Sequence, residues 1–275
     1  MFKPTMMWTV MLLLLCAQAL GQARKLNQAA AQLQPASDTC VFDFTTGTGH
    51  GHTQYCVTAN GNLAEFGVTG DSGLLLEMLN GLGPASEGYG LCSVDSLASY
   101  WDYANSDSGN WNASTAVSGT NSVIITRTTS DGAWKLQQRI ALLPGTSESY
   151  GAAKVQMAVT NLTNSDHIVV LMRHANVDAS GSSFNDFDTS STTAFGTALG
   201  GLGGLASTAS FLNYQFDFHF SPVQTNPDGP DPCKAFGQSG GQLGYFQGDG
   251  SLLQYFNLDL PPGKTKVVTV TYKPI

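Results

Sequence analysis

The chain has 275 residues, of which 12 are basic and 20 acidic, and its formal net charge is −8. An acidic chain without a basic run does not suit nucleic acid or an anionic membrane as a partner. Only 12% of the residues are charged, whereas 31 are glycine. This balance, with abundant Ser, Thr and Asn, is more typical of exported β proteins than of cytosolic helical ones.

The first 23 residues predict a secretory signal peptide, because Lys3 precedes an apolar run over residues 6–15 and small residues follow. We expect the mature protein to be secreted, either extracellular or periplasmic. No later run approaches the roughly 20 apolar residues of a spanning helix, so we expect no membrane span. Residues 24–38 have the composition of an N-terminal spacer, and residues 39–275 are predicted to form one domain.

Four cysteines follow the signal peptide: Cys40, Cys56, Cys92 and Cys233. An even number in an exported chain predicts two disulfides, and four cysteines allow three connectivities. We favour Cys40 with Cys56, which a local hairpin would bring together, and Cys92 with Cys233, which would close a long loop. A zinc site is the alternative, but no CxxC pair or clustered Cys and His spacing supports it.

The apolar residues after residue 39 recur mainly at every second position, which predicts strands. Asn60-Gly61 and Asp131-Gly132 each lie between strand-like runs and predict tight hairpins. Further on, a turn at residues 161–166 returns the alternating segment 154–160 into residues 168–172.

The end of the chain repeats this pattern, because residues 256–260 alternate before a PPGK turn and a closing strand, KVVTVTY. Short antiparallel strands with Gly, Asn and Asp turns predict an all-β, antiparallel β-sandwich or a larger supersandwich. Its long Gly/Ser/Asn/Asp-rich loops, at residues 103–121, 176–210 and 221–251, are the expected places for function.

The stretch SYWDYANSDSGNW, residues 99–111, combines aromatic rings with short polar side chains. A sugar needs an apolar face and hydrogen bonds to its hydroxyls, and this stretch offers both. The alternative is a strand whose rings alternate between core and surface, with Trp111 at the sandwich edge. The candidate ligand-binding residues are Tyr100, Trp101, Asp102, Tyr103, Asn105, Asp107, Asn110 and Trp111.

A second polar cluster lies in the loop after residue 177. Asp178, Asn185, Asp186 and Asp188 carry the oxygen ligands that calcium takes, although their spacing fits no defined calcium loop. Asx turns in a solvated loop explain the same residues. Calcium is therefore the only cofactor that the loop suggests, and we otherwise expect none.

Two shorter motifs invite a chemical interpretation. The GDSG sequence at residues 70–73 resembles a serine-protease nucleophile motif, but too little chain precedes it to build and align a triad, which favours a turn. His50 and His52 could hold a metal from one side of an extended segment. A Gly-rich turn with two exposed imidazoles explains the same pattern.

Three segments resemble the galactose-mutarotase-like β-sandwiches: VTANGNLAEFGV, AVTNLTNSDHIVVLMRHANVD and LDLPPGKTKVVTVTY. The order EGYG, DSGNW, RHANVD and NDFD is also similar to uncharacterised exported bacterial proteins. The mutarotase resemblance implies a His acid and a late Glu base. His174 could supply the acid, but the last Glu is Glu148, so Asp249 or Asp259 would have to replace the base.

These observations favour an exported, disulfide-containing binding protein that recognises a neutral glycan or another cell-envelope component. A mutarotase-like or lyase-like carbohydrate-active enzyme is the alternative, with His174 and Asp178 as candidate catalytic residues. The acidic net charge disfavours an acidic substrate for such a lyase. A structural or adhesive surface protein is the third hypothesis, which the long Gly/Ser loops motivate.

Overall fold

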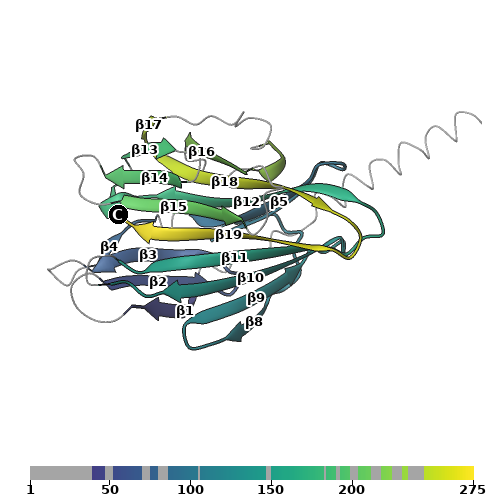
Figure 1. Cartoon of the computed structure of the whole chain (residues 1–275), viewed down its shortest axis with the longest axis horizontal. Helices are drawn as coiled ribbons and strands as arrows, with labels where there is room; N and C mark the ends of the chain where they lie inside the picture. Colours follow the sequence, from purple (N-terminus) through teal and green to yellow (C-terminus); the bar gives the residue numbers. More distant parts are fainter. Residues whose placement is uncertain are drawn as a thin grey trace, which may run out of the picture. The chain divides into compact units, whose positions relative to one another are not determined.

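Three antiparallel β-sheets carry the described residues of this computed structural model (Figure 1). The predicted signal peptide and the spacer at residues 24–38 lie outside those residues, and the chain from Pro35 to Ile275 forms one unit. In the part of the chain that the structure describes, no helix is long and apolar enough to cross a membrane. The described ranges are 39–46, 52–69, 75–79, 86–104, 106–146, 150–182, 184–189, 193–198, 204–211, 218–224, 231–234 and 245–275.

The smallest sheet contains the predicted Asn60-Gly61 hairpin. Gly61 has a φ of +92° and its N–H donates to the carbonyl of Thr58, so the tight turn between the second and third strands is confirmed. In sheet order the strands are β1 (Cys40–Thr45), β2 (His52–Thr58), β3 (Leu63–Thr69) and β4 (Leu75–Glu77).

The nine-stranded sheet shows the predicted alternation most clearly. In the strand after the Asp131-Gly132 hairpin, Trp134, Leu136 and Ile140 are buried while the residues between them face outward, except Gln138. In sheet order the strands are β17 (Phe246–Gly248), β13 (Asn185–Thr189), β14 (Thr193–Ala198), β15 (Gly204–Phe211), β19 (Thr265–Pro274), β11 (Ala152–Asn161), β10 (Trp134–Leu143), β9 (Ser122–Thr128) and β8 (Thr115–Ser118).

The six-stranded sheet has apolar side chains on both of its faces. In sheet order its strands are β16 (Phe218–Gln224), β18 (Gly250–Leu260), β12 (His167–Val177), β5 (Glu87–Ser93), β6 (Ala98–Tyr103) and β7 (Ser106–Asp107). Val169 and Leu171 of β12 belong to a core shared by all three sheets, whereas Val170 and Met172 belong to a second cluster on the outer face. The short 3-10 turn η1 (Ala179–Gly181) follows β12.

Two connections differ from the pattern expected from the sequence. The strands on either side of the turn at residues 161–166 lie in different sheets, and so do β18 and β19 on either side of PPGK. Both turns therefore cross from one sheet to the other. Asn161 joins the two crossings, because its side-chain amide donates to the carbonyls of Ser165 (2.7 Å) and Leu260 (2.8 Å). The periodicity of a sequence shows which residues of a strand alternate between its two faces, but it does not show which other strand pairs with that strand.

The two disulfides have the predicted pairing. Cys40 bonds to Cys56 and joins β1 to β2, while Cys92 bonds to Cys233 over a sequence separation of 141 residues. The antiparallel β-sandwich class is confirmed as well, since two larger sheets pack their inner faces around the shared core.

Candidate functional site

Strand alternation divides the predicted aromatic platform between two faces of the six-stranded sheet. On β6, Tyr100 and Asp102 point into the shared core, whereas Trp101 and Tyr103 belong to the outer-face cluster. Trp111 is 4% exposed and packs edge-to-face against Tyr100. Tyr100, Asp102 and Trp111 therefore share no surface with Trp101 and Tyr103, as the alternative of a strand with alternating rings predicted, because successive residues of a strand point to opposite faces.

The polar members of the same stretch are bound within the fold. Arg127 forms ion pairs with both Asp102 and Asp107, and all three side chains are buried. Burial raises the pKa of Asp102, and the Arg127 guanidinium opposes that rise. The amide of Asn110 donates to the carbonyl of Ser99 (2.8 Å), which holds the loop after β7 against β6.

A second ion pair, between Glu87 and Arg173, lies in the same core. The carboxylate accepts from Arg173 Nε (2.5 Å), from the Tyr272 hydroxyl (2.9 Å) and from the N–H of Leu63 (2.7 Å). Arg173 also donates to Gln138 Oε1 (2.5 Å). These residues come from all three sheets, so the network joins the sheets to one another. Our sequence interpretation missed it, although Gln138 and Arg173 both stand at inward positions between apolar neighbours.

The outer face of the six-stranded sheet brings together two predicted ligand residues and one predicted catalytic residue. Trp101 stacks on Tyr103 with ring centroids 5.4 Å apart, and His174 meets Tyr103 edge-to-face at 5.2 Å. Gly88 lies between Tyr103 and His174 in the sheet, and a Cβ there would lie 2.1 Å from the carbonyl oxygen of Asp102. The absence of a side chain at Gly88 lets the two rings meet above it.

Buried polar side chains continue this face along the sheet. Asn176 pairs with Ser251 across β12 and β18, and its N–H donates to the carbonyl of Ser86, so all three side chains share the outer face with His174. Within the described part of the chain, Ser86 Oγ, Ser251 Oγ and His174 Nδ1 are buried and have no hydrogen-bond partner. Such atoms are costly to leave unpaired, so they are expected where a ligand or water completes the bonding.

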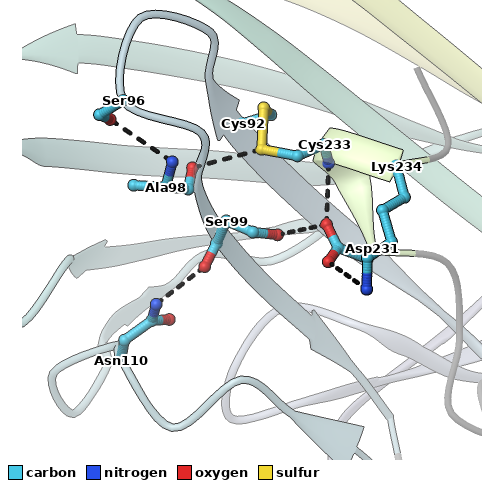
Figure 2. The surroundings of a disulfide bond; sticks show 8 residues. All are labelled: Cys92, Ser96, Ala98, Ser99, Asn110, Asp231, Cys233 and Lys234. Atoms are coloured by element: carbon cyan, nitrogen blue, oxygen red, sulfur yellow. Dashed lines mark hydrogen bonds and ion pairs between the residues drawn. A yellow bond between two sulfur atoms is a disulfide. The ribbon is translucent and has the colours of Figure 1, made fainter. Parts of the chain in front are cut away.

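A disulfide holds the chain segment 231–234 against this face (Figure 2). Cys233 bonds to Cys92 of β5, and Asp231 accepts hydrogen bonds from the Ser99 hydroxyl (2.8 Å) and the Cys233 N–H (3.0 Å). Pro232 lies directly over β5 at Gly90. The segment is thus fixed covalently beside Trp101, which is partly buried.

The predicted catalytic pair does not form. His174 and Asp178 are four residues apart, which is about 13 Å along an extended chain. Burial lowers the pKa of His174 to about 3, so the imidazole is neutral. Burial and the charges of Asp249 and Glu77 raise the pKa of Asp178. Asp178 therefore belongs to a separate acidic group with these two residues, beyond the end of β12.

The four predicted calcium ligands also separate. Asn185 is buried, and its amide donates to the carbonyls of Val177, at the end of β12 (2.9 Å), and of Ser182 (2.7 Å). Asp186 points the other way and accepts from the Tyr245 hydroxyl (2.7 Å). Among the described residues, Asp178, Asp186 and Asp188 do not gather within 4.8 Å of one another. The arrangement corrects the predicted cluster, since alternation turns Asn185 away from Asp186 and Asp188.

Several other predictions fall outside the described residues. Asn105, His50 and the GDSG sequence are among them. Within the described ranges, the metal-ligating side chains that lie close together are Cys40, Asp43 and Cys56, where a disulfide leaves no thiolate.

Comparisons with known proteins give a fold but no family. No protein-family model matches the sequence, and no curated protein matches it. A bacterial glucoamylase complexed with acarbose shares the fold with a TM-score of 0.54 and 8% identity, over 88% of this chain and 33% of that one. The chain thus spans about a third of the length of that enzyme.

Two further solved structures are similar. A GalM/aldose epimerase homologue from C. elegans has a TM-score of 0.47 and 9% identity, over 85% of this chain and 98% of that one. A heparinase III has a TM-score of 0.48 and 10% identity, over 88% and 35%.

Proposed function

We propose that this protein is an exported carbohydrate-binding protein whose site lies on the outer face of the six-stranded sheet. The outer-face site is defined here by Trp101, Tyr103, His174, Ser86 and Ser251. Two disulfides support export, because such bonds persist in oxidising compartments. A neutral glycan, or another envelope component rich in hydroxyl groups, is the proposed ligand.

The observation that carries this proposal is a set of unpartnered polar atoms beside a stacked aromatic pair. Ser86 Oγ, Ser251 Oγ and His174 Nδ1 are buried without partners among the described residues. Each such group costs about 1 to 3 kcal/mol unless something bonds to it. A sugar ring can stack on the face of Trp101, which is only partly buried, whereas Ser86, Ser251 and His174 are at most 1% exposed and would reach a sugar hydroxyl only through a bridging water or a shift of the residues that cover them.

Binding fits this site better than acid–base catalysis does. A general acid or base works best when its pKa lies near the working pH. Burial lowers the pKa of His174 to about 3, so at neutral pH the ring lacks the second proton that a general acid would give up, and it is a weak base. Glu87, which precedes Gly88 in β5, points into the core and is held by Arg173. A neutral imidazole is well suited to hydrogen bonding with a hydroxyl.

The test is a glycan array with the mature chain, followed by titration calorimetry on any neutral glycan that binds. Trp101→Ala should weaken binding about tenfold, since an aromatic face contributes about 1 kcal/mol beyond its buried area. Tyr245→Ala is the matched control, because Tyr245 is 69% exposed and lies beside the nine-stranded sheet. Trp101→Phe should recover part of the affinity.

Two results would count against the proposal. One is the absence of binding to any neutral glycan by a chain whose thermal unfolding shows that it is folded. The other is an equal loss of affinity in Trp101→Ala and Tyr245→Ala. Either result would assign the outer-face aromatics to packing under segment 231–234.

A further inference from the structure

The nine-stranded sheet has a basic centre that the net charge of the chain conceals. Strands β19, β11, β10 and β9 are contiguous (Figure 1) and contain no Asp or Glu. Their six basic residues stand in a chain of net charge −8. Arg127 and Lys266 stand at inner-face positions, and the outer-face positions belong to Lys135, Arg139, Lys154 and Lys273.

These four residues, here called the basic row, follow one diagonal across three strands. Lys135 and Arg139 are four residues apart on β10, which is about 13 Å. Lys154 pairs with Ala141, and therefore lies diagonally beyond Arg139. Lys154 also pairs with Thr271 of β19, so Lys273 lies diagonally beyond it. Diagonal neighbours are about 7 to 8 Å apart, so the basic row extends over roughly 25 to 30 Å.

The middle of the basic row is hollowed. A shallow cavity of about 210 Å³ is lined by Arg139, Lys154 and Gln156, with Ala141 and Leu143 as its apolar part. Arg139 is exposed and Lys154 is half-buried. A guanidinium, an ammonium and an amide thus surround a space with an apolar side. This chemistry suits a ligand group that is anionic at one end and carbon-rich at the other.

Among the described residues, the basic row has no carboxylate partner. None of its four members forms an ion pair within the described ranges of the chain. On the same sheet, the outward carboxylates Asp186 and Asp188 belong to β13, which is separated from β19 by β14 and β15. Like charges placed on a diagonal repel, and the fold does not relieve that repulsion.

From this geometry we infer a second binding site, in which the basic row and its hollow hold an acidic polysaccharide. The row is linear, as an extended polymer requires. Its cations are about 9 Å apart on average, whereas the phosphates of one nucleic-acid strand are about 3.4 Å apart. This spacing matches a polymer that carries its charges sparsely, on some of its sugar units only.

This inference is independent of the outer-face site on the six-stranded sheet. It also qualifies the expectation that the net charge excludes acidic partners, because a local field can differ from the sum of charges. An anionic group would lie between Arg139 and Lys154, and the sugar ring would lie against Leu143. Lys135 and Lys273 would bind the next charged units on either side.

The test measures binding of the folded mature chain to hyaluronan and unsulfated chondroitin, which carry a carboxylate on every second sugar only, with uncharged dextran as the neutral polymer. Both acidic polymers should bind, dextran should not compete, and affinity should fall as salt is raised. The double variant Arg139→Gln with Lys154→Gln should lose tenfold or more in affinity. The slope of log affinity against log salt concentration should become shallower by the equivalent of about two ionic contacts.

The control variant is Lys264→Gln, because Lys264 is an exposed lysine of the PPGK turn outside the basic row. It should change affinity less than twofold. The inference is overturned if neither acidic polymer binds, if Lys264→Gln equals the single variant Arg139→Gln, or if DNA or anionic vesicles bind more tightly than both polysaccharides. Neutral-glycan binding that persists in the double variant would show that the two sites are separate.

Discussion

Removing the charge of Glu87 should destabilise the protein more than any substitution at its surface. The carboxylate is fully buried and accepts two hydrogen bonds from Arg173, at 2.5 and 2.7 Å, and one each from Leu63 and Tyr272. In Glu87→Gln an amide N–H group would face the guanidinium at one of these positions. Arg173 would then remain as a buried charge without its counterion.

The size of the effect follows from these contacts. Breaking one partner of a buried ion pair costs about 3 to 5 kcal/mol, and a domain is stable by about 5 to 15 kcal/mol. Glu87→Gln should therefore lose about 3 to 5 kcal/mol and still show a folding transition. Adding Arg173→Met removes the orphaned charge, so the double variant should be about 2 to 3 kcal/mol more stable than the sum of the single effects.

Urea unfolding with both disulfides intact, followed by tryptophan fluorescence, measures these differences. The wild type, both single variants and the double variant complete the cycle. Lys264→Gln gives the scale of an exposed substitution, which should stay within about 0.5 kcal/mol. Strictly additive effects, or a Glu87→Gln variant as stable as the wild type, would refute the argument that Glu87 and Arg173 stabilise the fold as a coupled, buried ion pair.

Three other predictions concern stability. The pKa of His174 is lowered to about 3 by burial, so its neutral form contributes stability that is present above pH 6.5 and is lost as the pH falls toward 3. Over this range the free energy of unfolding, measured by urea titration, should change by about 1.4 kcal/mol per pH unit because of His174, and His174→Asn should remove that slope. An unchanged slope in the variant would contradict the prediction. Replacing Cys92 and Cys233 by Ser should cost about 4 to 5 kcal/mol, because the bond spans 141 residues, and a loss under about 1 kcal/mol in equilibrium unfolding would oppose this. Asn161→Ala should cost about 2 to 4 kcal/mol by thermal unfolding, because its amide joins both crossings between the sheets, whereas the exposed Asn112→Ala should lose less than about 1 kcal/mol.

Local chemistry accounts for the parts of the fold that could be predicted. Asn60-Gly61 and Asp131-Gly132 form the expected hairpins, since positive φ angles are encoded by the turn residues themselves. The Cys40–Cys56 bond follows from the same local hairpin. Alternation also identified strands and their buried residues correctly, because the period of two is a property of each strand alone.

The choice of partner strands could not be predicted in the same way. The turns at residues 161–166 and 261–264 look like hairpin turns, yet each crosses between sheets. The difference depends on Asn161, whose amide contacts residues far apart in the chain. A short turn sequence is compatible with both paths, and only packing of the two sheets decides between them.

The candidate site, like the fold, could be predicted only in part from the sequence. By itself, the sequence determined the fold class and the presence of aromatic and polar residues around Trp101, and it favoured the disulfide pairing that the structure shows. Only the tertiary structure decided that Tyr100 and Asp102 enter the core, and that Ser86 and Ser251 join Trp101 on the outer face. The physical reason is that residue types and turns act locally, whereas a site is formed by side chains from strands that become neighbours only when the sheets assemble.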